Sequence, residues 1–394
     1  MIYLDVTSAC QSPLNTGVKR MQRGWHGYLH GREDYTPVCW QSARRGYRTL
    51  TARDLNHLEP TAPHEVSRLG LFDSLVPGLF SNWLHFTSDA AHMLDWPARL
   101  NRGDVLLLPD LLWDNRAAFI AQLGSTTARR VAVFHDAIAL RRPEESGFDR
   151  FFCAKGVRAL ARMDAVICIS QEAERDLHFY WKEFGLKPVP TQVILWPVPF
   201  HGRPPASQPN FSAKSLLYIA RLEPHKNHLR LLDACEKLWR EGLSFELRLI
   251  GCLAYPGTAR LILRRVRALQ AAGRPVRWQA HVPESELHAA YAECSFTVFP
   301  SLLEGFGLPI IESLWHGRPV VCGANGALGE VAAGGGCEAV DTHSVESLAD
   351  GMRLLLTNEK RYQQLCTEIE ARPLRTWDDY WKEVCGWLDL PRNA

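Results

Sequence analysis

A regular alternation of short apolar runs with longer amphipathic stretches constrains the fold of this chain more than any other feature. In the first half, the runs predict strands at 1–6, 36–40, 104–110, 129–136, 164–170 and 191–198, and the stretches predict helices at 17–30, 114–123, 147–162 and 171–184. Strands that alternate with helices at this spacing pair in parallel through right-handed crossovers. The pattern therefore predicts an α/β fold with a doubly wound parallel sheet.

The alternation stops once and then starts again, which predicts two domains. Residues 199–214 hold four prolines among small and polar residues, a composition typical of a linker. Beyond them, strands are predicted at 215–222, 245–251, 276–282, 294–301, 319–323 and 337–341, and helices at 227–241, 258–272, 285–292, 308–316 and 344–357. The length of 394 residues also exceeds one ordinary core. We therefore expect two Rossmann-like domains with doubly wound parallel sheets.

The expected boundaries are residues 1–200 for the first domain, 201–214 for the linker and 215–374 for the second domain. A final helix over 375–394 is expected to pack back toward the first domain through one apolar face, formed by Trp377, Trp381, Val384 and Trp387. Ligands of open parallel sheets bind beyond the carboxyl ends of the strands. Two such sheets facing each other would place a ligand cleft between the domains.

The stretch 300–322, PSLLEGFGLPIIESLWHGRPVVC, combines an anion-binding turn with two carboxylates. Glycines on both sides of Phe306 let the backbone turn sharply, and Pro309 suits the first turn of the next helix. Backbone N–H groups at such a helix start form an anion site. Glu304 and Glu312 flank the turn, which suits a ligand with phosphates and sugar hydroxyls. The alternative is a Glu304 that only complements the helix dipole, together with a solvent-exposed Glu312.

A second polar loop follows the strand predicted at 215–222. Arg221 and Lys226 flank this loop, where they would stabilise a group with concentrated negative charge. Glu223 is placed to pair with either cation, and Asn227 is expected to cap the next helix. The alternative is that the two cations are simply exposed on the surface.

The pattern E-G-F-G-L-P-x-x-E over residues 304–312 resembles the signature of the retaining family-4 glycosyltransferases, which have the GT-B fold of two facing Rossmann-like domains. The resemblance implies that Glu304 lies against the transferred hexose and that Glu312 binds the ribose of the nucleotide. It also implies that backbone N–H groups hold donor hydroxyls and phosphate; these groups belong to Gly305, Phe306, Gly307 and Leu308.

Residues 218–234, YIARLEPHKNHLRLLDA, are similar to the first strand, loop and helix of the same family's donor domain. The resemblance implies that Arg221 and Lys226 neutralise the diphosphate of the donor. They would be catalytic because they stabilise a departing diphosphate more than the bound donor. The likeness covers 215–390 well and 1–200 loosely, which places the donor on the second domain and the acceptor on the first.

The first domain carries looser matches to this family. The resemblance implies that His135, at the end of an apolar strand, contacts the reacting sugar or the acceptor, although a lone histidine is more often structural. Asp136 beside it either shares that role or only caps the next loop. Gly17, at a helix start, is expected near the phosphate or acceptor, where many relatives carry a glycine pair. Arg20 either holds an anionic acceptor or is an exposed helix arginine.

The resemblance therefore implies a retaining enzyme that moves a hexose from a nucleotide sugar to a saccharide or lipid-linked saccharide in cell-surface polysaccharide synthesis, including that of lipopolysaccharide. GDP-mannose is the expected donor, while GDP-fucose, UDP-glucose and dTDP-rhamnose remain open. No metal or cofactor is expected, because no D-x-D motif precedes the site and the family usually needs none. The alternatives are a sugar-nucleotide epimerase or phosphorylase of GT-B shape, and a non-catalytic nucleotide-sugar-binding protein.

Composition limits the partners and the compartment. A net charge of +2 gives no support for nucleic-acid binding through broad positive charge. Eleven cysteines without any C-x-x-C spacing indicate reduced thiols in a cytoplasmic protein. No signal peptide or run of 18 apolar residues is present. Peripheral contact with the inner face of the cytoplasmic membrane is expected through 129–130, 141–142 or 179–187, although ordinary exposed helix faces explain these segments equally well.

Overall fold

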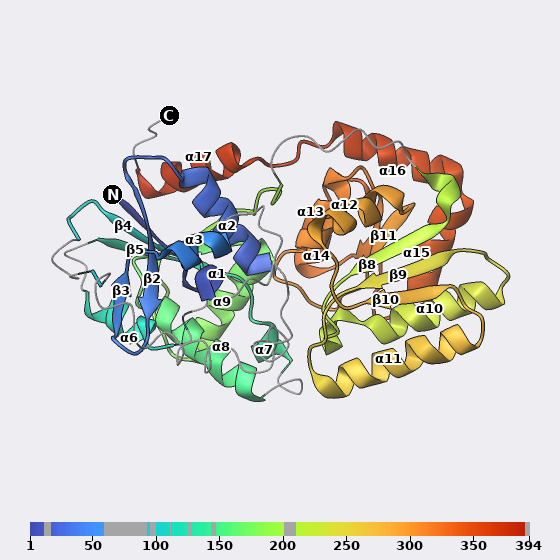
Figure 1. Ribbon diagram of the computed structural model, residues 1–394, viewed down its shortest axis with the longest axis horizontal. Coiled ribbons are helices and arrows are strands. Elements are labelled where there is room, and N and C mark those ends of the chain that lie inside the picture. The colour runs from blue at the N-terminus through green and yellow to red at the C-terminus, as the bar shows by residue number, and fades with distance from the viewer. Residues whose placement is uncertain are drawn as a thin grey trace. The chain divides into compact units, whose positions relative to one another are not determined.

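The structure is a computed structural model that describes residues 1–11, 17–58, 93–94, 100–110, 112, 114–123, 128–142, 147–200 and 210–390. The chain divides into two compact units, which are described separately (Figure 1). Unit 1 comprises Met1–Leu195 and Trp377–Ala394, and unit 2 comprises Trp196–Thr376. Most of the linker predicted over 201–214 lies outside the described residues.

Unit 1 is built on one seven-stranded sheet with the order β3-β2-β1-β4-β5-β6-β7. The strands are β1 (Ile2–Asp5), β2 (Tyr35–Gln41), β3 (Gly46–Arg48), β4 (Val105–Leu108), β5 (Arg129–Phe134), β6 (Ala165–Cys168) and β7 (Thr191–Val193). Neighbours pair in parallel, which confirms the predicted doubly wound sheet. The short edge strand β3 departs from the prediction because it returns antiparallel to β2.

The described helices of unit 1 include each helix predicted there. They are α1 (Thr7–Gln11), α2 (Gly17–Leu29), α3 (Ala52–Leu58), α6 (Arg116–Gln122), α7 (Ile138–Arg141), α8 (Gly147–Leu160), α9 (Gln171–Glu183) and α17 (Trp377–Leu388). The start of α9 follows from its sequence. The Ser170 side chain accepts a hydrogen bond from the Ala173 N–H, and two glutamates occupy the first turn.

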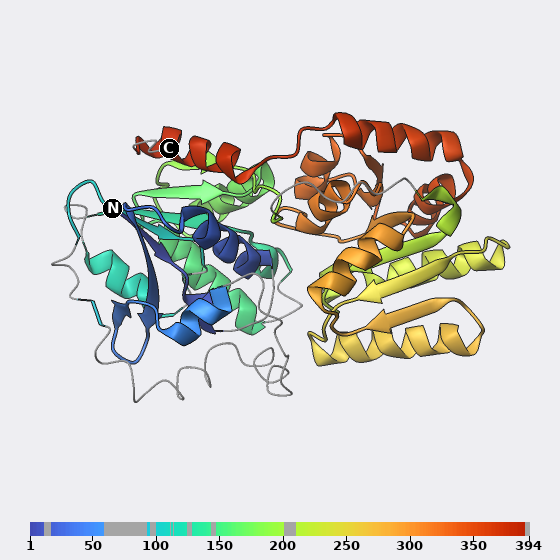
Figure 2. The same cartoon turned by 45° about the horizontal axis from the view of Figure 1, so that its top comes forward.

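The helix α17 belongs to unit 1 although all of unit 2 precedes it in the chain, as its red ribbon beside the blue α2 shows (Figure 2). A Cβ atom on Gly24 of α2 would lie 2.0 Å from the Trp377 ring, so only glycine fits this approach. The Tyr28 hydroxyl donates to Asp378 at 2.6 Å, and the Trp25 ring lies 6.2 Å from the Trp381 ring. The helix therefore covers α2 with aromatic side chains.

Unit 2 is built on a six-stranded, wholly parallel sheet with the order β10-β9-β8-β11-β12-β13. The strands are β8 (Ser215–Ile219), β9 (Glu246–Ile250), β10 (Val276–Gln279), β11 (Phe296–Phe299), β12 (Val320–Gly323) and β13 (Cys337–Val340). The helices are α10 (His228–Arg240), α11 (Pro256–Ala271), α12 (Glu284–Glu293), α13 (Leu308–Trp315), α14 (Gly326–Ala332), α15 (Val345–Thr357) and α16 (Glu359–Ala371). Each predicted strand of this half is confirmed.

Both sheets reverse their direction of winding between two central strands. The reversal lies between β1 and β4 in unit 1 and between β8 and β11 in unit 2. At such a switch point, the loops after the two strands diverge to opposite faces and leave space for a ligand beyond the carboxyl ends. The polar loops singled out in the second half follow β8 and β11, so the topology brings them side by side.

Candidate active site

The loops after β8 and β11 are joined by an ion pair. The Nζ atom of Lys226 lies 2.6 Å from Oε1 of Glu304, and the two side chains are only 16% and 11% exposed. A backbone hydrogen bond of 2.8 Å from the Leu302 N–H to the His225 carbonyl ties the same loops. The alternative of an exposed Lys226 is therefore wrong, because Glu304 holds it at the switch point.

The second cation of this loop has its own carboxylate partner. Nη1 of Arg221 lies 3.0 Å from Oε1 of Glu223, as the sequence suggested. The other oxygen of Glu223 lies 3.4 Å from Nε2 of His225. The Arg221 side chain is 42% exposed, whereas that of Glu223 is 10% exposed. Glu223 thus holds one edge of the guanidinium and leaves much of it open to solvent.

Asn227 joins three strand-end loops and does not cap α10 through its side chain. Its backbone is left-handed, with φ 61°, and its side chain makes no capping hydrogen bond. The side-chain amide instead donates to the carbonyls of Pro300, at 3.0 Å, and Thr342, at 2.8 Å. The predicted capping role is therefore wrong, because the side-chain amide donates its hydrogen bonds to carbonyls in the loops after β11 and β13. Tyr218 supports the same loop by donating to the Lys226 carbonyl at 2.5 Å.

The glycine turn after β11 has the expected backbone. Gly307 has φ 109°, a conformation that favours glycine, and α13 starts at Leu308 with Pro309 in its first turn. The Phe306 side chain is buried and packs edge-on against Trp196, with ring centroids 5.9 Å apart. The turn from Gly305 to Leu308 is thus anchored by an apolar side chain, and the ligand role of its N–H groups stays a prediction.

Glu312 is buried on α13. The residue is 3% exposed, and Tyr291 donates its hydroxyl to Oε2 at 2.9 Å. The Tyr291 ring in turn stacks on His316, with centroids 4.6 Å apart and an interplanar angle of 10°. The alternative of a solvent-exposed Glu312 is therefore wrong. Its carboxylate is held in place by α12, and the ribose-binding role remains a prediction.

His135 directly follows strand β5 of unit 1 and is 4% exposed. Its Nε2 lies 2.7 Å from the Pro109 carbonyl, which can only accept, so Nε2 carries the proton and Nδ1 is the acceptor of the neutral ring. Burial lowers the pKa of His135, which keeps the ring neutral at pH 7. Asp136 accepts a hydrogen bond from the Ile138 N–H at 3.0 Å, which is the capping alternative for this residue.

The other two residues singled out in unit 1 lie on α2. Gly17 is the first residue of the helix and is exposed, and Arg20 is half-buried. Residues 12–16, which precede Gly17, lie outside the described residues. The structure thus places both residues at the start of α2 beyond the end of β1, and their contacts with phosphate or acceptor remain predictions.

A buried charge network at the switch point of unit 1 was not predicted. Arg116, 1% exposed, lies with Nη1 2.9 Å from Asp5 and Nη2 3.1 Å from Asp110. Tyr47 donates its hydroxyl to the same oxygen of Asp5 at 2.9 Å. Asp5 is the last but one residue of the strand predicted at 1–6, and Asp110 is the last residue of the strand predicted at 104–110, which is the signal that marks them. One guanidinium thus bridges carboxylates at the ends of two neighbouring strands.

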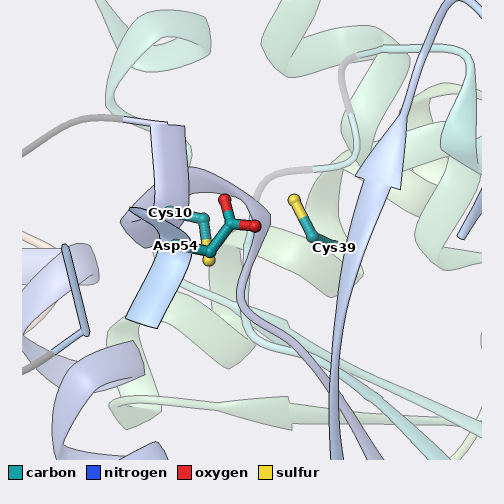
Figure 3. A group of neighbouring side chains, drawn as sticks. All are labelled: Cys10, Cys39 and Asp54. Atoms are coloured by element: carbon teal, nitrogen blue, oxygen red, sulfur yellow. The ribbon is translucent and has the colours of Figure 1, made fainter. Parts of the chain in front are cut away.

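Three side chains that are able to bind metals gather between α1, β2 and α3 (Figure 3). The ligand atoms of Cys10, Cys39 and Asp54 all lie within 4.8 Å of one another. However, Asp54 already accepts hydrogen bonds from Arg48 at 2.5 Å and from the Thr51 N–H at 2.8 Å. Burial raises the pKa of the Cys10 thiol well above its usual range, which favours the protonated thiol. Capping and ion pairing account for the place of Asp54, and the cysteines of the chain are free thiols, as predicted.

Acid is expected to destabilise the protein through His228, which is the first residue of α10, directly after the loop that carries Arg221 and Lys226. His228 is 2% exposed, and burial together with the Lys226 charge lowers its pKa to about 3. In the unfolded chain the pKa of His228 is about 6.5, so the unfolded state binds a proton at a higher pH than the folded state does. The contribution of neutral His228 to stability is therefore fully present above about pH 6.5 and is lost as the pH falls toward about 3. This group alone should cost about 2 kcal/mol of unfolding free energy between pH 7 and pH 5.

Urea unfolding at pH 7 and pH 5 measures this loss, and His228→Gln is the matched variant. The variant should lose about 2 kcal/mol less than the parent protein over the same interval. Equal losses in both proteins would show that the pKa of His228 does not differ between the folded and the unfolded protein.

Comparison with known proteins shows what the region around this site resembles. Residues 205–371 match the model of the family described as glycosyl transferases group 1. The chain is 26% identical over 333 residues to the serotype-specific mannosyltransferase WbdA of Escherichia coli, covering 73% of this chain and 39% of the relative. It is 34% identical over 142 residues to the O-antigen chain mannosyltransferase B of Escherichia coli, covering 34% and 36%. The chain thus spans about two fifths of the length of the first curated relatives it matches.

Two solved structures resemble nearly the whole chain. Alr3699/HepE of Anabaena, in complex with UDP and glucose, has a TM-score of 0.65 at 15% identity and covers 98% of this chain and 99% of its own. Sucrose-phosphate synthase of Thermosynechococcus elongatus has a TM-score of 0.64 at 16% identity and covers 98% of each chain. Both likenesses bear on the fold alone and confirm the GT-B class expected from the sequence. Residues 205–371 thus match the group 1 glycosyl transferases, and the chain has the GT-B fold.

Proposed function

We propose that the protein transfers a hexose from a nucleotide sugar, with GDP-mannose as the first candidate, to a saccharide or lipid-linked saccharide acceptor with retention at the anomeric carbon. The ion pair between Lys226 and Glu304 carries this proposal. It holds a cation for a diphosphate and a carboxylate for sugar hydroxyls at the sheet position where nucleotides bind. The mannosyltransferase names of the WbdA and O-antigen relatives support mannose as the transferred sugar.

In the proposed reaction, Arg221 and Lys226 take up the charge of the departing nucleoside diphosphate. The two cations already have carboxylate partners, Glu223 and Glu304, so the site is close to neutral before a donor arrives. A diphosphate that competes for Lys226 would release Glu304 to accept hydrogen bonds from the hexose. The donor would thereby complete the arrangement that the reaction needs.

The remaining roles follow the family pattern. Glu312 is proposed to bind the ribose, and the N–H groups from Gly305 to Leu308 to hold donor hydroxyls and phosphate. His135 is proposed to contact the reacting sugar or acceptor, with Asp136, Gly17 and Arg20 on the acceptor side. We propose that no metal is needed, because two cations serve the diphosphate. We also propose that the protein works in the cytoplasm, at the inner face of the membrane.

A thermal-shift screen of nucleotides and nucleotide sugars tests the donor. GDP-mannose should raise the melting temperature in a concentration-dependent way, with a stabilisation of about 2.7 kcal/mol at a concentration of about 100 Kd. GDP-fucose, UDP-glucose and dTDP-rhamnose are the competing donors. If none of these compounds binds, the proposed donor site is contradicted.

Activity with the donor identified in that screen separates an enzyme from a binding protein. Slow release of the nucleoside diphosphate without acceptor should be measurable, since water can replace the acceptor hydroxyl. Proton NMR of the glycoside product should show the anomeric configuration of the donor, and activity should persist in EDTA. Saturable donor binding without nucleotide release or transfer would favour the non-catalytic alternative, and an inverted product would contradict the retaining mechanism.

A further inference from the structure

Three phenylalanines of unit 1 are unusually exposed for a soluble domain. Phe148 and Phe151 on α8 are 59% and 65% exposed, and Phe179 on α9 is 54% exposed. Single exposed apolar residues are ordinary, whereas large apolar side chains gathered on neighbouring helices indicate a surface that something covers. The helix α8 packs against α9 on the same face of the sheet (Figure 1).

Exposed positive charge accompanies these rings. On α8, Phe148, Phe151 and Lys155 are spaced by three and four residues, so they share one side of the helix. On α9, Arg175, Phe179 and Lys182 are spaced by four and three residues, so they also share one side of their helix. We call the surface formed by these six residues the α8–α9 face.

Acidic side chains on the same helices are largely neutralised or withdrawn. Glu172 pairs with both Arg141 and Arg175, and Asp176 pairs with Arg141 at 3.4 Å. Glu174 accepts a hydrogen bond from Thr191 at 2.7 Å and is half-buried. Over α8 and α9, all of whose residues are described, the acidic side chain that is fully exposed is Glu183. The exposed charge of the face is therefore positive.

Three of the other arginines expected to touch a membrane make contacts within unit 1. Arg130 is 7% exposed and pairs with Asp164 at 2.8 Å. Arg129 donates to the Leu388 carbonyl of α17 at 3.0 Å. Arg141 joins α7 to α9 through Glu172. Among the described residues, no helix combines the length and apolarity needed to cross a bilayer.

We propose that the α8–α9 face docks unit 1 onto the surface of an anionic phospholipid bilayer. Amphipathic helices bind there by burying aromatic rings at the boundary of headgroups and acyl chains while lysine and arginine pair with anionic headgroups. Exposed rings with exposed cations and little exposed acid match that chemistry. The docking deepens the proposed function, because a transferase with a lipid-linked acceptor must reach the membrane.

Sedimentation with lipid vesicles tests the proposal without donor or acceptor. The protein should bind vesicles that contain phosphatidylglycerol far more strongly than vesicles of phosphatidylcholine alone, and high salt should weaken the binding. The triple variant Lys155→Gln, Arg175→Gln, Lys182→Gln should lose roughly fivefold in affinity per charge, on the order of a hundredfold in total. A second triple variant, Phe148→Ser, Phe151→Ser, Phe179→Ser, should also lose binding because its rings no longer insert.

The matched control removes three exposed cations from α11 of unit 2, by Arg260→Gln, Arg264→Gln and Arg267→Gln. This control should bind vesicles as the parent protein does, since it has the same net charge as the first variant but an intact face. An equal loss in the control, unchanged binding of both face variants, or equal binding to neutral vesicles would overturn the proposal. Self-association that disappears in the phenylalanine variant, without vesicle binding by the parent, would overturn it in favour of a second copy of the chain.

A nucleotide thermal shift on the same variants keeps this proposal separate from the proposed function. Both face variants should retain the donor-induced stabilisation of the parent protein, because the donor residues lie in unit 2. Retained stabilisation with lost vesicle binding supports docking. Normal vesicle binding by a protein that no nucleotide stabilises would contradict the donor proposal alone.

Discussion

Replacing Lys226 with alanine is expected to lower kcat roughly 10²- to 10³-fold, while the affinity for the free nucleoside changes far less. The cation lies at the switch point of unit 2, where the diphosphate of the donor is proposed to bind, and it gains most when the leaving group becomes fully charged. Steady-state kinetics with the donor, together with calorimetric binding of the nucleoside and of the diphosphate, measure the two effects.

A matched control for this prediction is Lys237→Ala on α10, which removes a partly exposed lysine paired with Glu346 at 3.0 Å. That variant should keep parental kinetics. Because Lys226→Ala also leaves the mostly buried Glu304 without its partner, its melting temperature has to be recorded alongside. Lys226→Arg keeps the charge and should recover part of the activity. Parental kcat in Lys226→Ala would remove this lysine from the mechanism.

The largest expected effect on stability belongs to Arg116 in the other unit. Arg116→Met should lower the free energy of unfolding by about 3–5 kcal/mol, because the buried carboxylates of Asp5 and Asp110 lose the guanidinium that pairs with them. Asp5 is 0% exposed and Asp110 is 6% exposed, so water cannot replace the lost partner. Urea unfolding monitored by tryptophan fluorescence measures the loss.

The pH dependence of this loss identifies its cause. Burial raises the pKa of Asp110 even with Arg116 in place, and removal of the cation should raise it further. A carboxyl whose folded pKa is raised is penalised above that pKa and relieved as the pH falls, so the deficit of Arg116→Met should shrink between pH 7 and pH 5. Arg175→Gln, which breaks an exposed pair with Glu172, should cost at most about 1 kcal/mol. A deficit that is independent of pH would point to lost packing.

The sequence predicts the layered architecture well because buried parallel strands leave a strong pattern. Each predicted strand is present in the structure, including the short β12 and β13. The two polar loops of the second half could be paired in advance, since strand order at a switch point brings the ends of β8 and β11 together. The close approach of Lys226 and Glu304 follows from that topology.

Details that depend on three-dimensional packing could not be predicted. Asn227 has the residue type and position of a helix cap, yet its amide bonds to carbonyls from two distant loops. Glu312 has the spacing of an exposed helix residue, and Tyr291 from another helix buries it. The strand β3 is only three residues long, which is too short for a period of two to be recognised. For Asn227 and Glu312, a partner that is distant in the sequence decides the outcome.

The place of α17 bears on how a growing chain reaches its native state. Domains usually fold in order as they leave the ribosome. Here the aromatic cover of Trp25 and Gly24 is encoded after residues 196–376, so unit 2 is complete in sequence before unit 1 is. Unit 1 therefore cannot bury the apolar side of α2 against α17 until the later unit has been synthesised. During that interval the nascent protein offers chaperones a binding surface that the finished protein conceals.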